Sequence, residues 1–142
     1  MTIATILGGK GSDVVSVSGD RTVAEAVTLL ASRRIGAVPV IAGDAVIGIF
    51  SERDVIYSLE REGQTALGRR VSEVMTAPAI TVTPEESILG ALALMTRRRI
   101  RHLPVMANGR CVGVVSIGDL VKHRIERIES EAEAMRAYIQ QA

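Results

Sequence analysis

Gly48–Asp54 (GIFSERD) and Gly113–Asp119 (GVVSIGD) are the two stretches that decide the fold, because they repeat one pattern of glycine, serine and aspartate. The match extends without a gap over 16–55 and 81–120, where 12 of 40 positions are identical. A tandem repeat of this size predicts two supersecondary units, each with an apolar face that packs against the other. We expect a ligand in the groove between such units.

Each repeat predicts the order strand, helix, strand, strand, helix. Short strands are expected at 14–17 and 80–82, and apolar residues at helical spacing follow each of them. In the second copy, Pro84 and two glutamates are expected to open the helix. Two apolar runs then predict a hairpin in each repeat, over 37–50 and over 103–115.

Ser51 and Ser116 are expected as N-caps of the next helices, 52–61 and 117 onward. The class is therefore α+β, with two tandem β-α-β-β-α repeats related by a pseudo-two-fold axis and an extended C-terminal helix. The expected divisions are an N-terminal segment (1–13), repeat 1 (14–62), a linker (63–73), repeat 2 (74–122) and the helix extension (123–142).

The last helix is expected to be long and to carry an apolar stripe. From Val121 its apolar residues recur in alternating steps of four and three, which is the spacing of a heptad seam. A second chain would cover such a stripe, which predicts a homodimer. The alternative is that the helix folds back on its own module.

Composition narrows the function classes. The chain has 142 residues, 47% of them hydrophobic, three aromatic residues and a net charge of +1. Few aromatics and a balanced charge argue against a nucleic-acid binder, although Arg97–Arg101 keeps that reading open. Cys111 lies in an apolar run and is expected as a small buried residue. No secretory signal or apolar membrane span is evident, so a cytoplasmic location is expected.

The sequence resembles a tandem pair of CBS domains, a regulatory module that binds adenosine-containing ligands. The resemblance covers residues 14–121 and includes both glycine–serine–aspartate stretches. It also rests on four further segments, Ser16-Val17, Thr81-Val82, Arg34–Val40 and Arg99–Val105.

The resemblance implies ribose contacts at the start of each second helix. Asp54 and Asp119, three residues after Ser51 and Ser116, would accept hydrogen bonds from ribose hydroxyls in two related pockets. The alternative is that each serine and aspartate is only a capping pair. The resemblance further assigns the following residues to the base and the strand ends: Ser16, Thr81, Ile35, Gly36, Ala37 and Ile100.

The phosphate position differs between the repeats. The second repeat offers Arg101 and His102, whereas the first offers only Gly36 and Ala37. Arginine is suited to phosphate, so the pockets are expected to be unequal. Arg53 could add a donor to the first pocket, or it could be a solvated helix residue.

No catalytic constellation or zinc-site spacing is evident, so we expect no enzyme activity and no metal. The leading expectation is a stand-alone regulatory pair that binds AMP, ADP, ATP or NAD(H) and signals energy or redox state through dimer conformation. S-adenosylmethionine also remains open as the ligand. The other class of function is a structural dimerisation or docking module with vestigial pockets and an unidentified protein partner.

Overall fold

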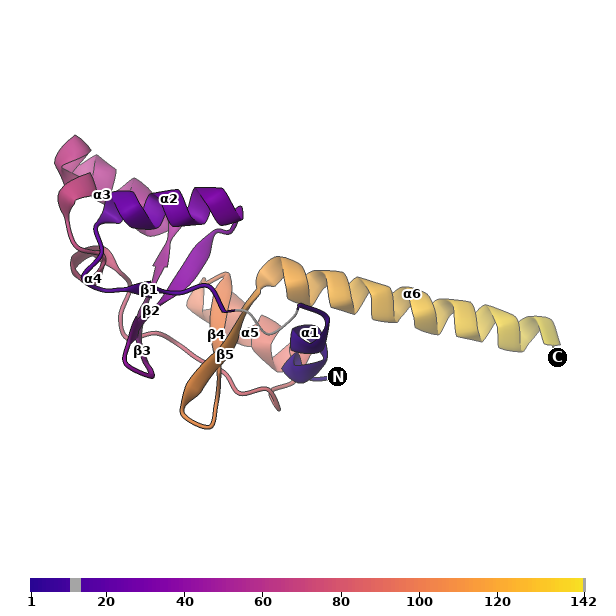
Figure 1. Cartoon of the computed structure of the whole chain (residues 1–142). Helices are drawn as coiled ribbons and strands as arrows, with labels where there is room; N and C mark the ends of the chain where they lie inside the picture. Colours follow the sequence, from indigo (N-terminus) through magenta and orange to yellow (C-terminus); the bar gives the residue numbers. More distant parts are fainter. Residues whose placement is uncertain (11–13, 142) are drawn as a thin grey trace.

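The computed structural model describes residues 1–10 and 14–141. Figure 1 shows two α/β units next to each other, with the last helix running away from them as a long rod. Positions 11–13 of the expected N-terminal segment, and Ala142 of the expected extension, lie outside the described residues.

The first unit has the predicted order of elements. They are β1 (Val17–Ser18), α2 (Val23–Arg33), β2 (Ala37–Ala42), β3 (Ala45–Ser51) and α3 (Glu52–Glu62). Strand β2 lies in the middle of the sheet, parallel to β1 and antiparallel to β3. The observed β1 is shorter than the expected strand and begins at its last residue. The core of this unit includes Val23, Val40 and Phe50, which are buried.

The second unit follows a linker that contains η1 (Gly63–Gly68) and α4 (Val71–Val74). Its elements are α5 (Ile88–Arg98), β4 (His102–Ala107), β5 (Arg110–Ser116) and α6 (Ile117–Gln141). β4 and β5 form an antiparallel hairpin. In place of the strand expected at 80–82, the structure has a single parallel bridge between Val82 and Val105.

The predicted opening of the helix in the second unit is wrong. Pro84 and the two glutamates form a turn, and the helix begins at Ile88 after the N-cap Ser87, whose Oγ accepts a hydrogen bond from Gly90 N–H. The carbonyls of Pro84 and Glu86 instead accept hydrogen bonds from the first residues of α1 (Ile3–Lys10), at 2.9 Å each. Because the turn makes this contact with a segment far away in the sequence, its own residues do not reveal it.

Each unit is completed by a short helix that comes from outside it. Helix α1 buries Ile3 and Ile6 in the core of the second unit. Helix α4, from the linker before the second unit, buries Val71 in the core of the first. The two units therefore exchange their preceding segments, which ties them together.

Helices α2 and α5 end in the same way. Their C-cap residues, Arg34 and Arg99, have φ values of 54° and 55°, in the left-handed region. This reversal turns the chain sharply into β2 and β4. One backbone hydrogen bond then links each turn to the next helix. In the first repeat it runs from Glu52 N to Gly36 O (3.0 Å), and in the second from Ile117 N to Arg101 O (2.8 Å). The turn before the hairpin therefore has the same backbone conformation and the same contact with the next helix in both repeats.

Candidate functional site

Two neighbouring clefts lie where the units meet, and both are built from residues of both repeats. We name them the Arg101 cleft, with a volume of about 660 Å³, and the Asp119 cleft, with a volume of about 420 Å³. Both fall in the range of small-molecule sites. The clefts share Gly36, Ala37 and His102, so they adjoin each other at this point.

The Arg101 cleft combines the start of α3 with the turn before β4. Its lining residues come from β2, β3, α3, the segment after α4 and the Arg99–His102 turn: Gly36, Ala37, Ile49, Ser51, Glu52, Arg53, Ile56, Tyr57, Thr76, Pro78, Ala79, Ile80, Ile100, Arg101 and His102. The lining combines aliphatic side chains with the basic Arg53, Arg101 and His102 and the acidic Glu52. This combination suits a ligand with an apolar ring and an anionic group.

The Asp119 cleft combines the start of α6 with the turn before β2. Its lining residues come from α1, the chain before β1, the Arg34–Ala37 turn and the end of β5: Leu7, Val14, Val15, Arg34, Ile35, Gly36, Ala37, His102, Gly113, Val114, Ser116 and Asp119. The cleft therefore has a carboxylate on its wall together with one arginine and one histidine.

The phosphate candidates meet in one cleft. The sequence placed Arg53 in the first repeat's pocket and Arg101 with His102 in the second's, yet all three line the Arg101 cleft. Arg53 Nη1 also donates a 3.1 Å hydrogen bond to Arg99 O, which joins α3 to the turn of the other repeat. The expected inequality of the two pockets thus takes the form of a basic cleft and a less basic one.

Asp54 is held by the protein rather than open to the cleft. Its side chain is only 8% exposed. Oδ2 accepts hydrogen bonds from Ser51 N–H (2.9 Å) and Ser51 Oγ (3.2 Å), and Oδ1 accepts one from Thr76 Oγ1 (2.9 Å). Asp54 therefore orients Ser51 and Thr76, both of which line the Arg101 cleft. This carboxylate could accept a further hydrogen bond from a ribose hydroxyl only if the hydroxyl lay next to Ser51 and Thr76.

Asp119 occupies the equivalent position and lies on the cleft wall. Its Oδ2 accepts a hydrogen bond from Ser116 N–H (2.9 Å), and Ser116 Oγ accepts one from Asp119 N–H (3.1 Å). This reciprocal pair is a capping box at the start of α6. The capping geometry and exposure to the cleft coexist here, so the two readings of the motif do not exclude each other.

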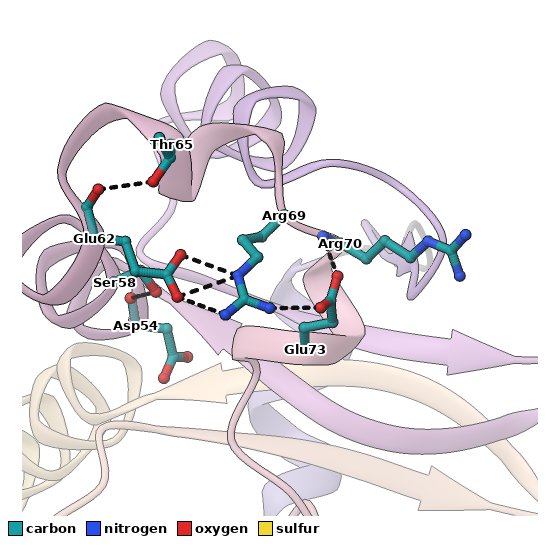
Figure 2. Close-up of polar contacts among 7 residues, drawn as sticks. All are labelled: Asp54, Ser58, Glu62, Thr65, Arg69, Arg70 and Glu73. Carbon is teal, nitrogen blue, oxygen red and sulfur yellow. Dashed lines mark hydrogen bonds and ion pairs between the residues drawn. The ribbon is translucent and has the colours of Figure 1, made fainter.

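The linker before Thr76 is anchored by Arg69, which contacts Glu62 and Glu73 (Figure 2). Arg69 donates hydrogen bonds to Glu62 at the end of α3 (Nε to Oε2, 3.0 Å) and to Glu73 in α4 (Nη1 to Oε2, 2.6 Å). The hydrogen bond from Arg69 lowers the pKa of Glu62. The pKa of Glu73 is lowered by Arg70 N–H and then by Arg69. The network joins the linker to the helix that carries Asp54.

A close backbone approach continues this anchoring. Ile49 and Thr76 exchange two backbone hydrogen bonds of 2.9 Å, beside Gly48. A Cβ at Gly48 would lie 2.8 Å from Thr76 O and 2.6 Å from Met75 Sδ. Only glycine lets the linker lie this close to β3.

The remaining base and strand-end candidates divide between the clefts. Ile100 lines the Arg101 cleft and Ile35 lines the Asp119 cleft. Ser16 and Thr81 are exposed, and each stands one position after a lining residue, Val15 and Ile80. Two further lining residues, Thr76 and Leu7, were missed by sequence reasoning, because both precede the stretches that match between the repeats.

A third pocket lies between α2 and α3. It has a volume of about 430 Å³ and is lined mostly by aliphatic side chains of the two helices, including Leu30, Val55 and Ile56. It contains neither aspartate, and the predicted base residues on its wall, Ile35 and Gly36, also line the Asp119 cleft. We therefore treat it as part of an apolar helix surface.

Several other features bear on chemistry. Among the described residues, no cluster of three or more His, Cys, Asp or Glu side chains could hold a metal ion. Across 1–10 and 14–141, no helix is long and apolar enough to cross a membrane. Cys111 is half-buried, and burial raises the pKa of its thiol. Its Sγ donates to Gly113 O at 3.4 Å, in keeping with a structural role.

Known proteins with this pattern are CBS-domain proteins. The CBS domain model matches residues 11–61 and 71–126. The CBS domain-containing protein YhcV of Bacillus subtilis is 32% identical, over 87% of each chain. The crystal structure of the CBS-domain protein ATU1752 from Agrobacterium tumefaciens is 38% identical with a TM-score of 0.84, covering 87% of this chain and 99% of that one.

A more distant structure shares the fold alone. The CBS domain pair of MJ0100 was solved in complex with 5'-methylthioadenosine and S-adenosyl-L-methionine. It is 20% identical, with a TM-score of 0.79, and covers 89% of this chain and 98% of that one.

Proposed function

The chain belongs to the CBS domain family, and from this premise we propose that it is a non-catalytic sensor of adenosine-containing ligands. The ligands we have in mind are AMP, ADP, ATP and NAD(H), held in the clefts between the repeats. The observation that carries this proposal is the meeting of Arg53, Arg101 and His102 on one cleft that also has an aliphatic wall.

Each part of such a ligand has a matching part of the cleft. Arginine side chains bind phosphate oxygens with paired donors, so Arg53 and Arg101 would take the phosphates. Ile80 and Ile100 offer apolar surface to the adenine. Ser51 and Thr76, held by Asp54, would take the ribose hydroxyls in the Arg101 cleft, and Asp119 would take them in the other cleft.

The less basic Asp119 cleft favours a different ligand or a different part of one. With a carboxylate and fewer cations, it suits a nucleoside with little negative charge, and S-adenosylmethionine belongs to this class. A ligand that touches both repeats would stabilise one angle between them, and only a difference in affinity for two arrangements can transmit a signal. We expect a protein partner to recognise this angle between the repeats in the homodimer.

Calorimetric titration with ATP, AMP, adenosine and S-adenosylmethionine tests the proposal. For the double variant Arg53→Ala/Arg101→Ala we expect ATP affinity to fall by about tenfold to a hundredfold, and adenosine affinity by less than about threefold. Arg97→Ala/Arg98→Ala removes the same charge at the end of α5, outside the cleft, and is the matched control. Unchanged ATP affinity in the double variant would refute the phosphate assignment.

The second candidate is a docking module without a ligand. It is favoured by large apolar side chains that stand exposed on α3 and α6, among them Ile56, Tyr57 and Ile125. Thermal shift against the same compounds separates the two functions, because a bound ligand raises the melting temperature by mass action. No shift with any adenosine compound, for a folded protein, would leave docking as the function.

A further inference from the structure

Helix α6 has an exposed apolar seam that no other part of the described chain covers. Leu120 is fully buried in the second unit, and after it the helix leaves the module (Figure 1). The seam consists of Val121, Ile125, Ile128, Ala132, Met135 and Ile139. Ile125 and Ile139 are 50% and 64% exposed. The steps of four and three place all six residues on one stripe of the helix.

A helix with an apolar stripe gains stability when that stripe is packed. In proteins most helical stability comes from packing of an amphipathic face rather than from intrinsic propensity. The seam extends for about 27 Å at 1.5 Å per residue. It therefore needs a partner with a matching apolar stripe, and the charges beside the seam identify that partner.

The flanks of the seam carry charges of alternating sign. In heptad notation Arg124 and Glu131 occupy g positions, and Glu129 and Arg136 occupy e positions. In a parallel pair, g of one helix faces the next e of the other. Arg124 then faces the partner's Glu129, and Glu131 faces the partner's Arg136. Both kinds of pair are attractive, and each occurs twice in a symmetric dimer.

The antiparallel pair is disfavoured by the same side chains. With all six seam residues aligned, e faces e and g faces g. Glu129 would then face its own copy, as would Glu131, and Lys122 would face Arg136. Like charges across such a seam are repulsive. Glu131 also accepts a 2.9 Å hydrogen bond from Arg127 Nε on its own helix.

We propose that α6 pairs with α6 of a second copy of this chain as a parallel two-stranded coiled coil. Both modules then lie at the same end of the coil, with both C-terminal ends together at the other. This inference rests on the homodimer in the proposed function but not on its ligand. Three heptads with one alanine layer make a weak coil, so we expect it to set orientation and to add to a contact between the modules.

Cysteine cross-linking tests the orientation in the full chain, in a Cys111→Ser background. In the parallel coil residue 139 meets its own copy, so Ile139→Cys should form a disulfide-linked dimer under mild oxidation. In the antiparallel pair it lies about 27 Å from its copy and meets residue 121 instead. Ala137→Cys, on the outer face, is the matched control. A cross-link only between mixed Ile139→Cys and Val121→Cys chains would overturn the proposal.

A charge exchange provides the second test, measured as the dimer dissociation constant by sedimentation. Glu129→Arg places like charges opposite each other twice and should weaken the dimer by about threefold to tenfold. Adding Arg124→Glu should restore it, whereas Glu126→Arg, away from the seam, should have little effect. A dimer that Arg124→Glu does not rescue, or that forms no cross-link at 139, refutes the coil alone. A monomeric chain would also refute the homodimer in the proposed function.

Discussion

The Arg101 cleft and the Asp119 cleft start from the same motif and differ in what the rest of the chain brings to it. In the first, Thr76 Oγ1 donates to Asp54, and the aspartate is buried beside the cleft. Asp119 lies on the wall of its own cleft. One sequence motif therefore yields a structural anchor in one repeat and a cleft-facing acceptor in the other.

The comparison teaches that the chemistry of a repeat is set by the segment that precedes the other repeat. Helix α4 and Thr76 complete the first unit, whereas α1 and Leu7 complete the second. The basic side chains are exchanged in the same way, because Arg101 and His102 of the second repeat line the cleft next to Asp54 of the first. Two copies of a motif thus diverge in function without losing their defining residues.

Replacing each aspartate with alanine should give the largest difference in stability between the two repeats. Asp54→Ala removes the acceptor of three hydrogen bonds, from the half-buried Ser51 and the exposed Thr76, and should lower the free energy of unfolding by about 2–4 kcal/mol. Asp119→Ala removes a helix cap and should cost about 1 kcal/mol. Urea unfolding at one protein concentration measures both. Equal losses would show that the two carboxylates have the same structural role, and Thr76→Val should reproduce part of the Asp54→Ala loss.

Alanine at the paired glycines sharpens the comparison of the two exchanged segments. A Cβ at Gly48 would meet the Thr76 carbonyl of the backbone, so Gly48→Ala should cost about 1–3 kcal/mol. A Cβ at Gly113 would meet Leu7 Cδ2 at 2.5 Å, the end of a flexible side chain, so the cost should be smaller. Thermal unfolding of the two variants gives the order. A larger loss for Gly113→Ala would contradict the argument that the backbone neighbour at Gly48 yields less easily than the Leu7 side chain at Gly113.

The smallest effect concerns the pH dependence of the linker network. Arg69 lowers the pKa of Glu62 and contributes to the lowered pKa of Glu73. A carboxylate with a lowered pKa in the folded state stabilises the fold above its ordinary value of 4.5, and this contribution is lost as pH falls through the folded pKa. Arg69→Gln should therefore be slightly less stable than the wild type at pH 7 and equal to it in strong acid.

Unfolding at several pH values, with Arg98→Gln as the control for charge loss, checks this expectation. The exposed positions of the network keep the effect small. A stability difference that grew as the pH fell would have the wrong sign and would exclude the Arg69 network as its source.

Much of the fold followed from local patterns. The apolar spacing predicted α2 and the body of α5, and the N-cap serines predicted α3 and α6. The two hairpins were confirmed, with strand boundaries within one residue of those expected. Local signals failed where a distant segment decided the outcome. Pro84 and its glutamates resembled a helix start, yet their carbonyls bond the N-terminal helix. Helix α1 itself was not predicted, because its apolar residues pack on the second unit and not on a neighbour in sequence.

The candidate site was only partly accessible from the sequence. Arg53 and Arg101 were predicted as phosphate donors, since their charge and position relative to the motif are properties of the chain itself, and this role stays a prediction. Their common cleft was not foreseen, because the two residues are brought together only when the repeats pack. Thr76 gave no signal, because it precedes the stretches that match between the repeats.

The sequence by itself determined that there are two like units, which residues form their helices and hairpins, and which side chains stand at each helix start. These are matters of local propensity and periodic burial, and each is decided within about a dozen neighbouring residues. Only the tertiary structure decided which aspartate is buried, which cleft is basic and which segment completes each unit. Those outcomes depend on contacts between residues far apart in the chain, where packing and hydrogen bonding across the interface override the symmetry of the repeat.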